Sequence, residues 1–159
     1  MNLVYNAKAS ISILTPYVAL DKEIRNALIL SIKSGVKVRL IFEDNNTKKK
    51  VKNFARTYFY DLIRDGVEVY EYKGGKMSSN LIMVDDNTAL ISTNNLDYSV
   101  KTNHFNGGVY IHGDAVVLAY NDIREIVTNS QLLTIKDLQK RRAGDKISAL
   151  WKKFFRNFR

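Results

Sequence analysis

Residues 78–98 read SSNLIMVDDNTALISTNNLDY, and this stretch carries the strongest information about the architecture. Two short apolar runs, Leu81–Val84 and Ala89–Ser92, flank the triplet Asp85-Asp86-Asn87. Asp and Asn accept the backbone angles of tight turns, so the pattern predicts two short strands joined by a hairpin turn.

Before this hairpin, predicted strands alternate with predicted helices. Two units share one design, in which a helix ends at a glycine and a β-branched strand follows, once at Gly35 and once at Gly66. Ile11 and Ile13 fall on one face of the first strand. The predicted strands cover residues 10–15, 36–42 and 67–72, and the predicted helices cover residues 21–34 and 51–65.

After the hairpin, the pattern predicts one more strand and two helices. Val109–His112 is the strand, Asp114 is the expected cap of a helix over residues 115–129, and Thr134 the expected cap of a helix over residues 135–142. This succession predicts an α/β fold, a sandwich with a mixed β-sheet. We expect one domain over residues 1–133 and a separate segment over residues 134–159.

Composition excludes several classes of protein. The 159 residues, 45% hydrophobic and 26% charged, have the composition of a globular domain. No apolar run reaches the length of a membrane span, and the first residues do not form a signal-peptide pattern. Without Cys and with only two His, the chain has no disulfides and no thiolate metal site. We expect no metal and no cofactor, and structural roles for His104 and His112.

The net charge of +9 is concentrated near the end of the sequence. Residues 136–159 hold nine basic and two acidic residues, whereas residues 1–135 are nearly neutral. Large apolar residues recur there at the spacing of one helix face, with basic residues beside them, which predicts a helix that lies on an anionic membrane surface. The predicted membrane-binding residues are Ile147, Leu150, Trp151, Lys152, Lys153, Phe154, Phe155, Arg156 and Phe158. Packing of this helix on protein is the alternative.

The polar positions of residues 78–98 resemble the motif of the phospholipase D superfamily, His-x-Lys-x4-Asp followed six residues later by Gly-Ser-x-Asn. The spacing from Asp85 to Thr93 and Asn95 fits this motif without gaps. Asn95-Leu96-Asp97-Tyr98 and Thr15-Pro16-Tyr17 are similar to the second phospholipase D-like domain of bacterial cardiolipin synthases. The resemblance implies a phospholipase D-like α/β/α sandwich with a mixed sheet, followed here by a C-terminal amphipathic helix.

The motif is degenerate at the positions that carry the chemistry of the family. Ser78 and Asn80 stand where the family has His and Lys, and Asn106 where it has the acid that orients the His. In the family, two motifs meet across an interface; one His attacks phosphorus and the other protonates the leaving group. We therefore expect no catalytic activity from this chain alone. The degenerate motif positions are Ser78, Asn80, Asp85, Thr93, Asn95 and Asn106, of which Ser78, Asn80, Thr93 and Asn95 are the expected phosphate-binding residues.

Together these features predict the C-terminal phospholipase D domain of a cardiolipin synthase-like phosphatidyltransferase, as a fragment of a longer chain. The expected partners are an anionic phospholipid membrane and a second phospholipase D-like half, from the same longer chain or from a homodimer. The expected location is the cytoplasmic face of a bacterial membrane. The alternative is a nucleic-acid-binding or dimerising module, since small one-motif members of the superfamily are homodimeric nucleases and a basic tail suits phosphates.

Overall fold

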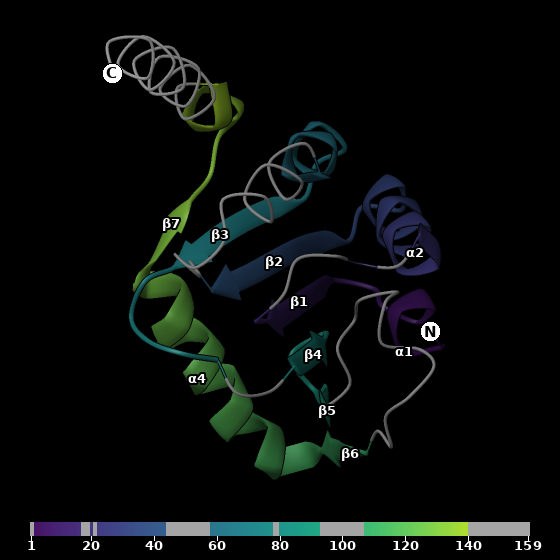
Figure 1. Cartoon of the computed structure of the whole chain (residues 1–159). Coiled ribbons are helices and arrows are strands. Elements are labelled where there is room, and N and C mark those ends of the chain that lie inside the picture. Colours follow the sequence, from purple (N-terminus) through teal and green to yellow (C-terminus); the bar gives the residue numbers. More distant parts are fainter. Residues whose placement is uncertain are drawn as a thin grey trace, which may run out of the picture.

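A computed structural model describes residues 2–16, 20, 22–43, 58–77, 80–92 and 107–139. In this part of the chain a seven-stranded sheet lies between two layers of helix (Figure 1). The strands are β1 (Ser10–Thr15), β2 (Lys37–Glu43), β3 (Glu68–Tyr72), β4 (Asn80–Val84), β5 (Thr88–Ser92), β6 (Gly108–His112) and β7 (Ser130–Leu132). The strands predicted from the sequence are confirmed to within one residue at each end, whereas β7 was not predicted.

The sheet is mixed, as predicted, with the order β6-β5-β4-β1-β2-β3-β7. The strands β1, β2 and β3 are parallel neighbours, because a helix brings the chain back to the same edge after β1 and β2. The strands β4, β5 and β6 form an antiparallel meander beside β1, and β7 pairs antiparallel with β3. The central strand β1 therefore has one parallel and one antiparallel neighbour.

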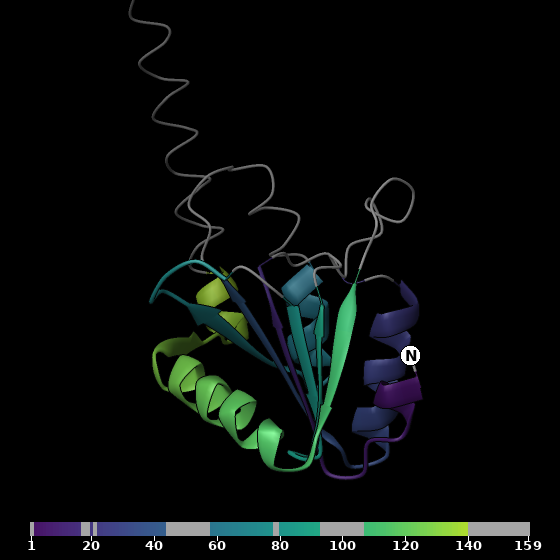
Figure 2. The same ribbon diagram turned by 90° about the horizontal axis from the view of Figure 1, so that it is seen from below.

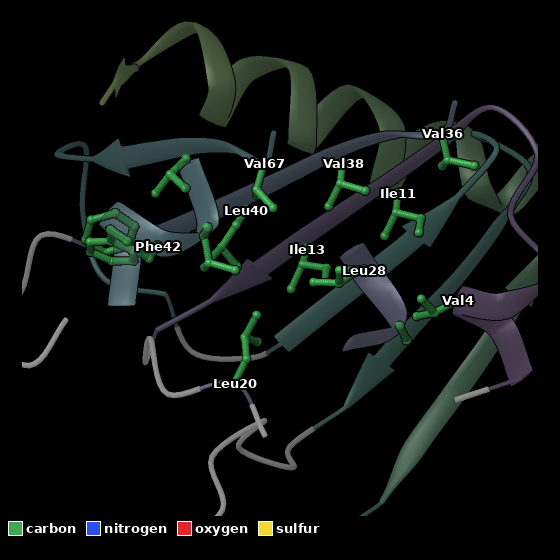
Figure 3. Packing of buried hydrophobic residues seen from close by; sticks show 14 of the residues in the cluster. Val4, Ile11, Ile13, Leu20, Leu28, Val36, Val38, Leu40, Phe42 and Val67 are labelled. Atoms are coloured by element: carbon green, nitrogen blue, oxygen red, sulfur yellow. The ribbon is translucent and has the colours of Figure 1, made fainter. Parts of the chain in front are cut away.

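One face of the sheet is covered by α1 (Asn2–Tyr5), α2 (Lys22–Lys33) and a helical stretch at residues 58–64. Ile11 and Ile13 of β1 are buried there against Leu28 of α2 (Figure 3), as their spacing predicted. Gly35 and Gly66 follow the two helices with φ angles of 87° and 101°, a left-handed conformation that glycine adopts without strain. The rest of the predicted helix over residues 51–65 lies outside the described residues.

The other face is covered by α4 (Val116–Thr128), as Figure 2 shows. This helix packs Val116, Ala119 and Ile123 into a second apolar cluster. The prediction that Asp114 caps this helix was wrong. Asp114 lies inside a short 3₁₀ turn, Gly113–Ala115, that continues directly into α4. The N–H of Val116 donates to the backbone carbonyl of Gly113, so the turn itself, and not the Asp114 side chain, satisfies this N–H group at the start of α4.

Thr134 does cap a helix, and it does so together with Asp137. The N–H of Asp137 donates to the Thr134 hydroxyl oxygen over 3.2 Å, and the N–H of Thr134 donates to the Asp137 carboxylate over 2.9 Å. This reciprocal pair is a capping box, and residues 135–139 are helical. Leu133 and Leu138 are buried in the same cluster as Val67. Residues 140–159, with every predicted membrane-binding residue, lie outside the described part.

Candidate functional site

The carboxyl ends of the parallel strands β1, β2 and β3 meet at one edge of the sheet, where β4 begins and β5 ends. Ligands of open α/β sheets commonly bind at this edge. Asn80 opens β4 there and is 2% exposed, directly opposite Ser92 of β5. Thr15, fully buried, ends the neighbouring strand β1. The edge thus carries a buried amide with hydroxyl groups on the strands beside it.

Of the six predicted motif positions, the structure describes Asn80 and Asp85. Ser78, Thr93, Asn95 and Asn106 lie outside the described residues. Asn80 and Asp85 are not brought together, because β4 runs its whole length between them, about 17 Å at 3.4 Å per residue. Asn80 belongs to the carboxyl edge, whereas Asp85 belongs to the hairpin turn at the opposite edge, the position that its sequence context predicted.

The Asp85 carboxylate accepts hydrogen bonds from three successive backbone N–H groups. The nitrogens of Lys8, Ala9 and Ser10 lie 2.9, 2.7 and 2.9 Å from its oxygens. Burial raises the pKa of Asp85, but the N–H groups of Ser10, Ala9 and Lys8 together outweigh burial and hold the pKa below its ordinary value. Asp85 is therefore a structural acceptor, with its hydrogen bonds directed into the protein.

A residue that sequence analysis did not single out is Glu43, the last residue of β2. Its carboxylate accepts the backbone N–H of Met77 over 2.8 Å. Met77 directly precedes Ser78, the predicted counterpart of the family's nucleophilic His. The signal available in the sequence was the position of Glu43 at the carboxyl end of a predicted parallel strand. The contact with Met77 was not predictable in the same way, because it depends on the path of the chain between β3 and β4.

His112 ends β6 at the edge opposite to Asn80, so it is not part of this site. Its ring stacks on Tyr110, with 6.4 Å between the ring centres, and its Nδ1 lies 3.2 Å from the Thr88 hydroxyl. Both contacts lie within strands β5 and β6, and His104 lies outside the described residues. In the described ranges, no three His, Asp or Glu side chains cluster as a metal ion requires, and no helix is long and apolar enough to span a bilayer.

A family model described as "Cardiolipin synthase, PLD-like domain" matches residues 1–125. Cardiolipin synthase 2 of Bacillus anthracis is 30% identical to this chain over 146 residues, which are 91% of this chain and 28% of that protein. The chain spans only 20% to 33% of the length of such curated relatives. The matched region is therefore a third or less of each of these proteins.

Solved structures show the same fold at low sequence identity. Nuc from Salmonella typhimurium, a phospholipase D family member, has a TM-score of 0.70 at 17% identity, over 83% of this chain and 86% of that one. Phosphatidylserine synthase of Haemophilus influenzae has a TM-score of 0.65 at 19% identity, over 98% of this chain and 41% of that one. With the family match over most of its length, this chain belongs to the family of cardiolipin synthase phospholipase D-like domains.

Proposed function

We propose that this chain is a catalytically inactive, phosphodiester-binding domain of a longer cardiolipin synthase-like protein. Membership of the family supports the ligand class, and the small share of its relatives' length supports a longer parent. In such a parent we propose a second phospholipase D-like half as the partner, joined in the same chain or supplied by a second copy. We assign residues 1–133 to the domain and residues 134–159 to a basic amphipathic segment, whose start packs Leu138 into the core of the domain and whose residues from Ile147 onward bind the membrane.

Asn80 is the observation that carries this proposal. It lies buried at the start of β4, at the carboxyl edge, in the position where the family motif has Lys. An amide donates a hydrogen bond to a phosphate oxygen but carries no formal charge. It therefore does not neutralise the negative charge that develops on the phosphoryl group in a transition state.

The second support is Ser78, which replaces the nucleophilic His of the motif. A serine hydroxyl at neutral pH attacks phosphorus only when a base activates it. The loss of one general acid alone removes about 10²–10⁴-fold of rate. Hydroxyl and amide groups still bind phosphate oxygens, so we assign the phosphodiester to Ser78, Asn80, Thr93 and Asn95.

For residues 134–159, we propose binding to anionic membranes on the cytoplasmic face. The capping box of Thr134 and Asp137 begins a helix just before the basic, aromatic stretch of sequence. Each Lys or Arg near an anionic surface contributes about 1 kcal/mol to binding, so the nine basic residues from Lys136 onward supply a substantial attraction.

Two measurements on the full chain test the site. Nuclear magnetic resonance titration with glycerophosphoglycerol, a soluble phosphodiester, is expected to shift the amide signals of Asn80 and its neighbours. A phosphatidyl-transfer assay is expected to give no turnover for the natural sequence. Turnover above the protein-free rate would refute the inactive assignment, and absence of titration shifts would refute phosphodiester binding.

Vesicle sedimentation tests the membrane segment separately. We expect the full chain to sediment with vesicles containing phosphatidylglycerol or cardiolipin and not with neutral vesicles. A chain ending at Ala143 is expected to stay in solution. Duplex DNA binding that falls steeply with salt and persists without the tail would instead support a nucleic-acid-binding module.

A further inference from the structure

The segment that joins β3 to β4, residues 73–79, has to cross the ends of two other strands. The sheet order places β2 and β1 between β3 and β4. Three gaps between neighbouring strands amount to about 14 Å. Seven residues and their flanking bonds reach roughly 25 Å when extended. The segment is therefore longer than the distance it has to cross, so its length alone does not determine its path along the carboxyl edge.

The described part of this segment, residues 73–77, follows the α4 side of the sheet (Figure 1). Met77 packs against the apolar cluster beneath α4, which also contains Tyr72 and Ile41. Glu43 lies two residues after Ile41 on β2, so its side chain projects to the same side. On that side the Glu43 carboxylate accepts a hydrogen bond from the backbone N–H of Met77, with 2.8 Å between oxygen and nitrogen. The hydrogen bond between the Glu43 side chain and the Met77 backbone N–H therefore holds the segment from β3 to β4 at the end of β2.

We infer that Glu43 is a positioning residue for the phosphate site, an inference that rests on the proposed function. Met77 directly precedes Ser78 in the chain, and Asn80 is held in place by its pairing with Ser92 in the sheet. Ser78 and Ser79 therefore connect two residues that are both held, one by Glu43 and one by the sheet. In the described part of this segment, packing of the Met77 side chain against the cluster beneath α4 is the second restraint on the chain before Asn80.

The chemistry of Glu43 distinguishes positioning from direct contact with a ligand. A carboxylate near a bound phosphodiester repels it, so Glu43 contributes through the N–H that it holds. Glu43→Gln keeps an acceptor oxygen at the same reach and removes the charge. This variant is therefore expected to retain the Met77 bond and to bind a phosphodiester at least as tightly as the natural sequence.

Hydrogen exchange at the Met77 amide tests the bond itself. Removal of a charge-assisted acceptor is expected to speed this exchange about 10-fold or more in Glu43→Ala, and by less in E43Q, whose neutral amide oxygen still accepts a weaker bond. Glu68→Ala is the matched control, since Glu68 lies on the neighbouring strand at the opposite edge, bonded to Lys37. If E43A does not fold, Glu43→Ser replaces it in this experiment, because a serine side chain is too short to reach the Met77 N–H. Unchanged exchange in the shortened variants would overturn the inference.

Titration of the same variants with glycerophosphoglycerol tests the positioning role. We expect E43A to bind about 10-fold more weakly, a loss equivalent to one good hydrogen bond, and E43Q and E68A to bind as the natural chain does. Equal affinity of E43A and the natural chain would overturn the role of Glu43 alone. No binding by any of the proteins, including the natural chain, would overturn the proposed function.

Discussion

The carboxylate of Asp85 lies 2.7 Å from the backbone nitrogen of Ala9, and the two residues are 76 positions apart in the sequence. The N–H of Asp85 in turn donates to the carbonyl of Ser10 over 2.9 Å. These bonds attach the start of β1 to the turn between β4 and β5. Asp85 is a predicted motif position, but its hydrogen bonds stabilise the end of β4 that is remote from Asn80.

Replacement of Asp85 by Asn is expected to lower the free energy of unfolding by about 1–3 kcal/mol, because an amide accepts fewer and weaker bonds from the three N–H groups. Asp86→Asn is the matched control. Both residues have φ of 53°, which Asn tolerates, so neither change strains the turn. Urea unfolding at neutral pH gives the comparison, and equal losses in D85N and D86N would contradict it.

The stabilisation by Asp85 is expected to depend on pH. Burial raises the pKa of this carboxyl, but the backbone N–H groups lower it more, so the native pKa lies below the unfolded one. A lowered native pKa gives stability that is complete above the unfolded value, about 3.9, and is lost as the pH falls through the native value. Urea midpoints of the natural chain and D85N should therefore converge on acidification below about pH 4. A constant difference would refute this.

Replacement of Gly74 by Ala is expected to destabilise the domain, because an added Cβ would lie 2.5 Å from the Tyr72 hydroxyl oxygen and 2.6 Å from the adjoining ring carbon. The phenol end of the half-buried Tyr72 side chain can move aside, so we expect a small loss, below about 1 kcal/mol. Gly107→Ala, whose Cβ meets nothing within 4 Å, is the control. Thermal unfolding followed by circular dichroism measures both, and a G74A midpoint equal to that of G107A would disprove the clash.

Replacement of Thr134 by Ala removes the hydroxyl that accepts the Asp137 N–H. The loss of a helix cap costs about 1 kcal/mol, so T134A should unfold at lower urea than the natural chain. Thr128→Ala is the control, since the Thr128 hydroxyl bonds the Arg124 carbonyl within an existing helix. If T134A and T128A unfold at the same urea concentration, the capping box does not stabilise the chain.

Most of the regular elements followed from the sequence because they have local signals, but α1 was not predicted. Ile11 and Ile13 alternate along β1, and Gly35 and Gly66 follow their helices, where the structure gives both a positive φ. In contrast, β7 is three residues long and largely exposed, so no apolar alternation marks it. It exists because β3 offers an edge to pair with.

The site was less accessible to sequence analysis because its contacts join distant parts of the chain. The turn position of Asp85 was predicted from its neighbours, whereas its three N–H donors come from the start of β1. Likewise, Glu43 meets Met77 only because the chain from β3 crosses β2 on its way to β4. The failed cap at Asp114 has a local cause, because the 3₁₀ turn that contains Asp114 runs directly into α4 and the Gly113 carbonyl accepts the Val116 N–H.

Because β1 lies at the centre of the sheet, its two edges are completed at different times during synthesis on the ribosome. Phe42, which pairs with Thr15, is made well before Val84, which pairs with Ile11. At 5–20 residues per second the delay is about 2–8 s. Throughout this interval the buried strand β1 presents one edge of unpaired backbone N–H and C=O groups, to which a strand of another chain can pair.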